Sequence, residues 1–276
     1  MKKVFILTAL AATLFASCTK ENVNKPEPEP GTSTETLAQQ IIGKWVLTLF
    51  DGNAVPTNAK VVYTFTSETQ GYLSASMLST SSSEPTWANH APSNITINGD
   101  SVIMRGALNK TTSYEAKLKV TSISGTMMLT ESKYTVFRNG ESVYVNYGTT
   151  QWTKVTRDYS RDILGKWEGR VTNNEGSEFD DGELHRWEYF ADGSYIYYNL
   201  DADSNWVPQA TELSEYFVDG TLLCTRWKNS GEGEVENREW WDIASIADGV
   251  MNWTALRKRE SSDSTYTATF QMTKVQ

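Results

Sequence analysis

The amino-acid sequence predicts an all-β protein made of two tandem eight-stranded antiparallel domains, and three observations lead to this prediction. The stretch "IIGKW" at 41–45 returns as "ILGKW" at 163–167. Short apolar runs at hairpin spacing, separated by turn residues, occupy both halves of the chain. The 276 residues include 10 Trp, 13 Tyr and 9 Phe, which are residue types that favour strands and bury large areas.

Residues 1–17 are predicted to be a signal peptide and not part of the fold. Lys2 and Lys3 precede an apolar run that is shorter than the roughly 20 residues of a membrane-spanning helix. The run ends in "LFASC", and small residues directly before a cysteine resemble the lipobox of bacterial lipoproteins. The resemblance implies cleavage before Cys18 and lipidation of Cys18, although Phe15 stands where the lipobox favours Leu. An ordinary secretory signal is the alternative.

Residues 18–36 are predicted to form a disordered tether, because Pro, Glu, Thr and Ser dominate this segment and almost nothing in it can be buried. Such a tether lifts a folded body off a bilayer. Its first residues, "CTKEN", resemble the export signal of Bacteroides-type surface lipoproteins. That resemblance implies a lipid anchor in the outer membrane and a body exposed on the cell surface, and a periplasm-facing anchor is the alternative.

The rest of the chain is predicted to be one domain present twice, as residues 37–156 and 157–276. Besides the repeated GKW stretch, "WTKV" at 152–155 matches "MTKV" at 272–275. Between these anchors, "KVTSISGTMMLT" matches "DIASIADGVMNWT". Three matches in the same order at a nearly constant offset indicate duplication, and units this long are domains, since solenoid repeats are far shorter.

Each copy has the pattern of a series of short strands, with one helical candidate over 36–42. In the second copy, turn signals such as "NNEG", "ADG" and "VDG" separate the apolar runs. The expected strands are 165–172, 184–190, 194–200, 212–218, 221–228, 237–246, 250–257 and 265–274. This number and spacing suit an up-and-down barrel or a sandwich, and only the barrel closes its own edges.

Short motifs add a family resemblance that favours the barrel. A Gly-x-Trp near the first strand, "FADGSY" at 190–195 and "DGVMNW" at 248–253 resemble lipocalin-like (calycin) domains of bacterial envelope lipoproteins. The resemblance implies eight-stranded up-and-down barrels in which Trp45 and Trp167 plug the closed end. It also implies a basic residue packed over each plug. The sequence offers these basic residues at the end of each copy, as lysines where lipocalins usually have arginine: Lys154 and Lys274.

Composition and motif content argue against several function classes. A net charge of −9 at pH 7 gives no electrostatic basis for binding nucleic acid. His90 and His185 lie apart from each other and from any cysteine, so no metal site is expected. The stretch "DADSNWVPQATE" has calcium-loop spacing, but Trp206 stands where such a loop needs Gly.

Without a catalytic or cofactor motif, the protein is predicted not to be an enzyme and to use no cofactor. Cys224 is expected to be a buried, inert thiol.

The aromatic residues of the second copy give the candidate binding residues. Because side chains alternate along a strand, Trp240 and Trp241 must face opposite ways, whereas Tyr195 and Tyr197 share a face. The predicted ligand-binding residues are Tyr195, Tyr197, Trp227 and Trp241. Core packing is the alternative role for them.

The expected function is non-catalytic binding of a small apolar or amphipathic ligand in or at a barrel. Two alternatives stay open, which are a glycan-binding or adhesion protein with exposed aromatics, and a structural accessory that makes only protein contacts. An open apolar cavity favours the first function, a flat row of exposed aromatics favours the second, and a large apolar patch favours the third.

Overall fold

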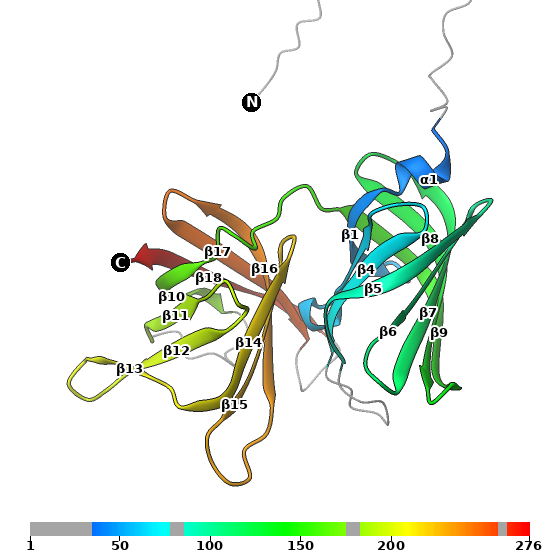
Figure 1. Ribbon diagram of the computed structural model, residues 1–276. Coiled ribbons are helices and arrows are strands. Elements are labelled where there is room, and N and C mark those ends of the chain that lie inside the picture. Colours follow the sequence, from blue (N-terminus) through cyan, green and yellow to red (C-terminus); the bar gives the residue numbers. More distant parts are fainter. Residues whose placement is uncertain (1–34, 78–85, 175–182, 259–263) are drawn as a thin grey trace, which may run out of the picture. The chain divides into compact units, whose positions relative to one another are not determined.

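The computed structural model describes residues 35–77, 86–174, 183–258 and 264–276, and its residues 35–276 form one compact unit (Figure 1). The predictions for the signal peptide, for Cys18 and for most of the tether fall outside the described residues. The described chain is all-β and antiparallel, with a short helix α1 (Leu37–Gln40) and a 3-10 turn η1 (Thr57–Ala59). In this part of the chain no helix has the length and hydrophobicity needed to cross a membrane.

The first sheet is a closed eight-stranded barrel. Its strands follow one another in chain order, and β1 pairs with both β3 and β9, which closes the ring. A two-residue strand, β2 (Asn53–Ala54), pairs only with the end of β1. The barrel strands are β1 (Gly43–Phe50), β3 (Val61–Phe65), β4 (Gln70–Met77), β5 (Thr86–Asn98), β6 (Ser101–Ala107), β7 (Thr112–Ile123), β8 (Met127–Arg138) and β9 (Glu141–Lys154). This meander fits the lipocalin-like barrel predicted for the first copy.

The second sheet curls in the same way, but it does not close. Its strand order is β13-β12-β11-β10-β18-β17-β16-β15-β14, so β13 and β14 are free edges. The prediction of a second closed, eight-stranded barrel is therefore wrong. The strands are β10 (Gly165–Asn174), β11 (His185–Tyr189), β12 (Tyr195–Leu200), β13 (Trp206–Pro208), β14 (Thr211–Asp219), β15 (Leu222–Asn229), β16 (Asn237–Ala247), β17 (Val250–Lys258) and β18 (Thr265–Val275).

The extra strand β13 explains the open seam. It pairs with the second half of β12 and so occupies the edge that β14 would need for a full ladder. What remains between β12 and β14 is one isolated bridge, Ser194–Glu215, with a hydrogen bond from the Ser214 hydroxyl to the Tyr195 carbonyl (2.5 Å). Pro208, which has no N–H to donate, ends β13 on this edge, as proline usually does in sheets.

In the loop before β13, the residues with calcium-loop spacing form a hydrogen-bonded turn. The Asp201 carboxylate accepts hydrogen bonds from the backbone N–H groups of Asp203 (2.9 Å) and Asn205 (2.7 Å). This is a local turn in which the side chain replaces a backbone acceptor. Apart from β13, the strands of the second copy lie within one or two residues of the predicted ranges.

The first repeated stretch is a buried tryptophan anchored to a helical turn. The predicted helix over 36–42 is confirmed as α1, which begins with a capping box at Thr36 and leads into buried Ile41. The indole Nε1–H of Trp45 donates to the Ile41 carbonyl (2.7 Å). The Lys154 ammonium lies 5.2 Å from the centroid of the Trp45 ring. Gly43, at φ 126°, lets the lysine chain pass, because a Cβ there would meet Lys154 Cε at 2.9 Å.

The second repeated stretch has the same construction. The Nε1–H of Trp167 donates to the Ile163 carbonyl (2.6 Å), and Lys274 lies 5.0 Å from the centroid of the Trp167 ring. Gly165 again has a positive φ, 105°. Both tryptophans are essentially inaccessible to solvent. The two copies thus share this tryptophan contact set, although only the first sheet closes.

The two sheets contact each other through an apolar cluster and charged pairs. Val46 and Val62 of the first sheet pack with residues of the second, which are Phe217, Leu222 and Cys224. Beside them, Lys44 Nζ lies 2.5 Å from Asp219 and 2.7 Å from Asp158, and Lys60 Nζ lies 2.6 Å from Asp242.

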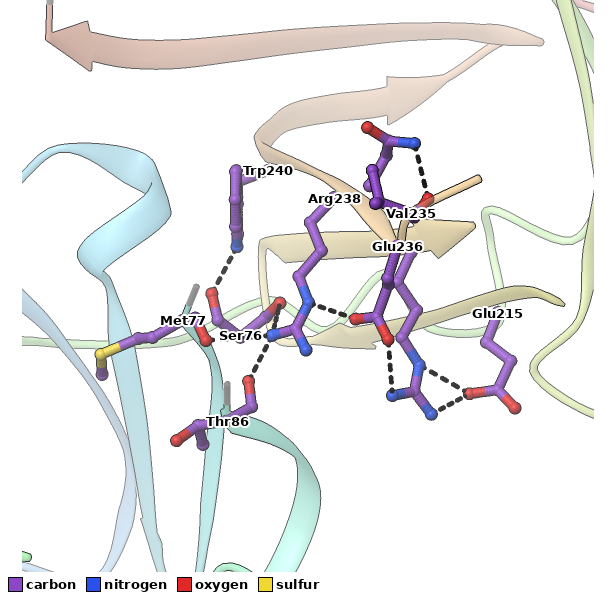
Figure 2. A network of polar contacts seen from close by, with 10 residues as sticks. Ser76, Met77, Thr86, Glu215, Val235, Glu236, Arg238 and Trp240 are labelled. Atoms are coloured by element: carbon purple, nitrogen blue, oxygen red, sulfur yellow. Dashed lines mark hydrogen bonds and ion pairs between the residues drawn. The ribbon is translucent and has the colours of Figure 1, made fainter. Parts of the chain in front are cut away.

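A second set of contacts joins β16 to the β4 and β5 ends (Figure 2). Arg238 donates to the carbonyls of Met77 (3.1 Å) and Thr86 (2.5 Å), and the Trp240 indole donates to the Ser76 carbonyl (2.6 Å). On the other side of the guanidinium, Arg238 Nε lies 2.7 Å from Glu236 Oε1. These bonds satisfy strand-end carbonyls of the first sheet with side chains of the second.

Candidate functional site in the first barrel

A cavity of about 540 Å³ lies inside the first barrel. This volume is within the range of pockets that hold small molecules. Strands β1, β3, β4, β7, β8 and β9, with β2 and η1 at one side, contribute its walls. Most lining residues are apolar or aromatic: Leu47, Phe50, Val55, Pro56, Val61, Tyr63, Met77, Ala116, Leu118, Tyr134, Tyr144 and Trp152.

The register of β9 places the cavity away from the end of the barrel that contains Trp45. Lys154 pairs with Trp45, and the next inward-facing residue, Trp152, pairs with Leu47. Trp152 lines the cavity, as do Thr150, Asn146 and Tyr144 farther along the same face of the strand. The cavity therefore extends from Trp152 toward the opposite end of the barrel from Trp45.

A stacked aromatic pair forms one end of the cavity. The rings of Tyr63 and Trp152 lie 4.6 Å apart at 22°, and both side chains are almost completely buried. Burial raises the pKa of Tyr63 well above its ordinary value, and it also raises the pKa of the neighbouring Tyr134. Both phenols therefore stay neutral at physiological pH, and this end of the cavity presents flat, uncharged rings.

Three hydroxyl groups make a polar spot on the otherwise apolar wall. The hydroxyl oxygens of Thr130, Ser132 and Thr150 lie 2.6 to 2.7 Å from one another. The indole N–H of Trp152 donates to Thr150 Oγ1 (2.8 Å). Ser132 and Thr150 line the cavity, whereas Thr130 is buried behind them. The hydroxyl cluster of Thr130, Ser132 and Thr150 thus fixes the tilt of the Trp152 ring and supplies a hydrogen-bonding point.

Ionisable side chains lie at the rim or outside the chamber. Asp51 is exposed, and its carboxylate accepts from the backbone N–H of Thr149 (2.8 Å). Lys133 follows inward-facing Ser132 and pairs with Tyr147, so strand alternation turns it outward, where its ammonium lies 5.3 Å from the Tyr147 ring centroid. Among the residues that line the cavity, these are the ones with a formal charge.

The predicted ligand-binding residues lie elsewhere, in the core of the second sheet. Tyr195 and Trp241 are buried there, and Tyr197 and Trp227 pack against the same cluster. The structure does bring the four together, in one aromatic cluster that also contains Trp187, Tyr189, Trp253 and Phe270. Neighbouring rings in this cluster lie 4.8 to 5.9 Å apart between centroids, for example Tyr197 and Trp187 at 5.1 Å. Trp240 faces away from Trp241 and contacts the first sheet, as strand alternation predicts.

Sequence reasoning missed the residues of the cavity, namely Tyr63, Ser132, Thr150 and Trp152. A signal was present in "LTESKY" and "GTTQWT", where small hydroxyl residues occupy inward-facing strand positions that larger apolar residues fill elsewhere. Small side chains leave space, and hydroxyls inside a barrel need partners. The prediction for the second copy was based on its many aromatic residues, and these are as typical of a filled interior as of a binding site.

The groups that could support other chemistry are dispersed or buried. In the described ranges, no set of three or more His, Cys, Asp or Glu residues is placed to hold a metal ion. Cys224 is buried in the contact between the sheets, and burial raises the pKa of its thiol well above the ordinary value. His185 packs in the aromatic core with its Nδ1 2.9 Å from the Tyr197 hydroxyl. His90 lies beside Asp219 at the contact between the sheets.

Comparisons with known proteins give little further guidance. No protein-family model matches the chain. No curated protein matches it significantly. One solved structure that is similar to the chain is a double mutant of the vaccine antigen transferrin-binding protein B from Haemophilus parasuis, at 8% sequence identity and a TM-score of 0.23. The match covers 79% of this chain and spans 61% of the length of that one.

Proposed function

We propose that this protein is a non-catalytic binding protein that holds a small apolar or amphipathic molecule inside its first barrel. The observation that supports the proposal is the 540 Å³ cavity with mainly apolar walls and one cluster of hydroxyls. Pockets of this composition bind ligands by burying apolar surface, and a few polar groups then orient the ligand. The second sheet, with its packed aromatic interior, supports the first barrel through the contacts between the sheets.

The proposal includes a lipid anchor at Cys18 that holds the protein in the outer membrane, exposed at the cell surface. Its support is the sequence pattern of a short apolar run, small residues and a cysteine, followed by a polar tether. Mass spectrometry of the protein from its native membrane tests the anchor directly. The N-terminal peptide should begin at an acylated Cys18, and Cys18→Ser should release the protein from the membrane fraction.

A fluorescence titration tests the cavity. The neutral probe N-phenylnaphthylamine brightens when it leaves water for an apolar site, so binding can be followed without knowing the natural ligand. Ala116 is buried and lines the cavity, so Ala116→Phe should fill the space and abolish the response. Ala107→Phe, on the exposed face of β6, adds the same ring outside and is the matched control.

The outcomes are clear-cut if both variants first give the thermal unfolding profile of the wild type. Probe binding by the wild type and by Ala107→Phe, but not by Ala116→Phe, supports the proposal. Equal binding by all three proteins contradicts it, because the probe then sits on the surface. Absence of binding in the wild type also contradicts it. If Ala116→Phe unfolds, Ala59→Trp at the exposed edge of the cavity replaces it as the blocking variant.

A second candidate function, contact with another protein, is favoured by one exposed stripe. Val143, Val145 and Tyr147 follow one face of β9 and are 42%, 42% and 64% exposed. Exposed apolar side chains in a row are typical of contact surfaces. Sedimentation of the purified protein at increasing concentration, compared with Val145→Ser, tests whether this stripe joins two copies.

A further inference from the structure

We propose that the cavity of the first barrel selects an uncharged, largely apolar molecule whose polar group donates a hydrogen bond to Ser132. This inference rests on the proposed function and names the ligand class. Three features of the cavity support it. The first is the hydrogen bonding within the hydroxyl cluster, and the second is the absence of an inward-facing charge among the described lining residues. The third is the stacked pair of rings of Tyr63 and Trp152.

The hydroxyl cluster has acceptor capacity to spare and no spare donor. Each hydroxyl has one O–H and two lone pairs. The mutual contacts of Thr130, Ser132 and Thr150 use all three O–H groups when they run in one direction around the triangle. Thr150 then has no free lone pair, because it also accepts from Trp152. Free lone pairs remain on Thr130 and Ser132, and of these two only Ser132 lines the cavity.

A ligand group that donates an O–H or N–H therefore completes the cluster. A group that can only accept must first break one of the existing contacts of 2.6 to 2.7 Å. A hydrogen bond contributes a net gain of about 0.5–1.5 kcal/mol. The cavity should therefore bind a ligand with a donor group about 2–10-fold more tightly than a ligand of the same shape that can only accept.

The charges around the cavity argue against an anionic ligand. The Lys133 ammonium is on the outer face over Tyr147, so no cation of the described lining points inward to pair with a carboxylate or sulfonate. Asp51 at the rim adds a negative charge that repels an anion on entry. An unpaired charge is costly to bury, so anionic ligands should bind far more weakly than neutral ligands of the same shape.

The apolar part of the ligand is expected to lie against the aromatic end of the cavity. Tyr63 and Trp152 present rings stacked with each other at 4.6 Å, and their edges and faces suit a flat, rigid ring system. Leu47, Val61 and Leu118 complete the apolar contacts around it. The chemical class is therefore a neutral aromatic or alicyclic molecule with a hydroxyl or amine N–H.

Matched probes test this class. N-phenylnaphthylamine and anilinonaphthalene sulfonate share the same two ring systems and the same N–H, and they differ in the sulfonate. We expect the neutral probe to bind at least ten-fold more tightly than the anionic one. Naphthol and methoxynaphthalene then compete for the bound neutral probe, and naphthol, which has the O–H donor, should compete about 2–10-fold better.

Variants locate the preference at Ser132. In Ser132→Ala/Thr150→Val, which also removes the lone pair that loss of Ser132 would free on Thr150, the advantage of naphthol over methoxynaphthalene should disappear, while the advantage of the neutral over the sulfonated probe should stay. Ser122→Ala, on the exposed face of β7, removes the same hydroxyl elsewhere and should behave like the wild type. A ratio of competitors is measured within one protein, so it does not depend on small differences in stability between the variants.

The results separate the inference from the proposed function. Equal binding of both fluorescent probes, or equal competition by both naphthalenes in the wild type, overturns the inference and leaves the cavity as a binding site. Persistence of the naphthol advantage in Ser132→Ala/Thr150→Val also overturns it, because the donor then bonds elsewhere. Failure of the neutral probe to bind at all overturns the proposed function and the inference together.

Discussion

Trp45 and Trp167 show how one short stretch can carry the same local structure twice. Each indole donates to the carbonyl of the isoleucine four residues earlier, and each lies beneath a lysine from the last strand of its own sheet. A lysine over an indole contributes a cation–π attraction of about 0.5–2 kcal/mol. Substitutions of these tryptophans, and of the glycines that make room for the lysines, are therefore expected to reduce stability.

Replacing Trp167 by Ala should destabilise the second sheet by about 3–5 kcal/mol, as large-to-small core substitutions do. The side chain is 1% exposed, so its removal leaves a hole that the surrounding structure cannot fully close. Urea unfolding followed by circular dichroism measures the change. Trp206→Ala, on the edge strand β13, is the control and should cost far less. Equal losses of unfolding free energy in the two variants would mean that the Trp167 contacts contribute no more to stability than those of Trp206.

Gly43→Ala should destabilise the first barrel by about 1–3 kcal/mol, because φ is 126° and the new Cβ would meet Lys154 Cε at 2.9 Å. Gly125 has an ordinary φ and open space around it, so Gly125→Ala should change stability by less than about 0.5 kcal/mol. Thermal unfolding of both variants gives the comparison. A Gly43→Ala protein as stable as Gly125→Ala would show that the lysine chain and the backbone relax freely.

At the scale of elements, the two sheets differ at the seam. In the first sheet, β1 and β9 pair through five residue pairs with one bulge, and the ring closes. In the second, β13 takes the edge of β12, and β14 is left with a single bridge. Unpaired strand edges are places where backbone hydrogen bonds open locally.

Amide hydrogen exchange should reveal this difference. The N–H groups of β14 that point away from β15 should exchange faster than those of β9, which pairs with strands on both sides. Tyr216 is the expected exception, because its N–H donates to the Gly193 carbonyl (2.8 Å). Exchange followed by mass spectrometry or NMR gives the protection along each strand. Uniform protection along β14, equal to that of β9, would show a seam that is closed in solution.

The strands could be predicted from the sequence because they follow local patterns. Apolar alternation, turn residues and the GKW stretch identified the strands of the second copy to within one or two residues. The short strand at Trp206 was missed because only three residues pair there, next to Pro208. Whether a sheet closes depends on edge pairing between residues distant in sequence, and no local pattern reports that.

The cavity could not be predicted for a similar reason. Its volume depends on small side chains that face inward on different strands, such as Ala116, Ser132 and Thr150. Periodicity tells which residues share a face, but not whether the facing residues fill the space between them. The prediction therefore selected aromatic residues of the second copy, and these pack against one another in its core.

At the scale of the whole molecule, Lys44 of the repeated stretch has a role that its counterpart lacks. It pairs with Asp158, in the segment between β9 and β10, and with Asp219 of β14, and so joins the first barrel to that segment and to the second sheet. Lys166, at the equivalent position, pairs with Glu188 of its own sheet at 3.5 Å. His90 approaches the same buried Asp219 carboxylate at 3.5 Å. The contact between the sheets thus contains one titratable group that responds near neutral pH.

The stability of this contact should fall as the pH rises past neutrality. The hydrogen bond to Asp219 raises the pKa of His90 above 6.5, so the protonated histidine contributes stability below that pH and loses it as the pH passes the raised pKa. The difference in unfolding free energy between wild type and His90→Gln should be largest near pH 5.5 and vanish near pH 8.5. Denaturant unfolding at both pH values measures it. A difference that does not change with pH would contradict this role for His90.

Native mass spectrometry of the full chain with N-phenylnaphthylamine tests the central claim most directly. The claim is that the first barrel holds an open chamber, whereas aromatic side chains occupy the interior of the second sheet. The account predicts one bound probe per chain in the wild type and none in Ala116→Phe. Two bound probes per chain, or one that persists in Ala116→Phe, would contradict it.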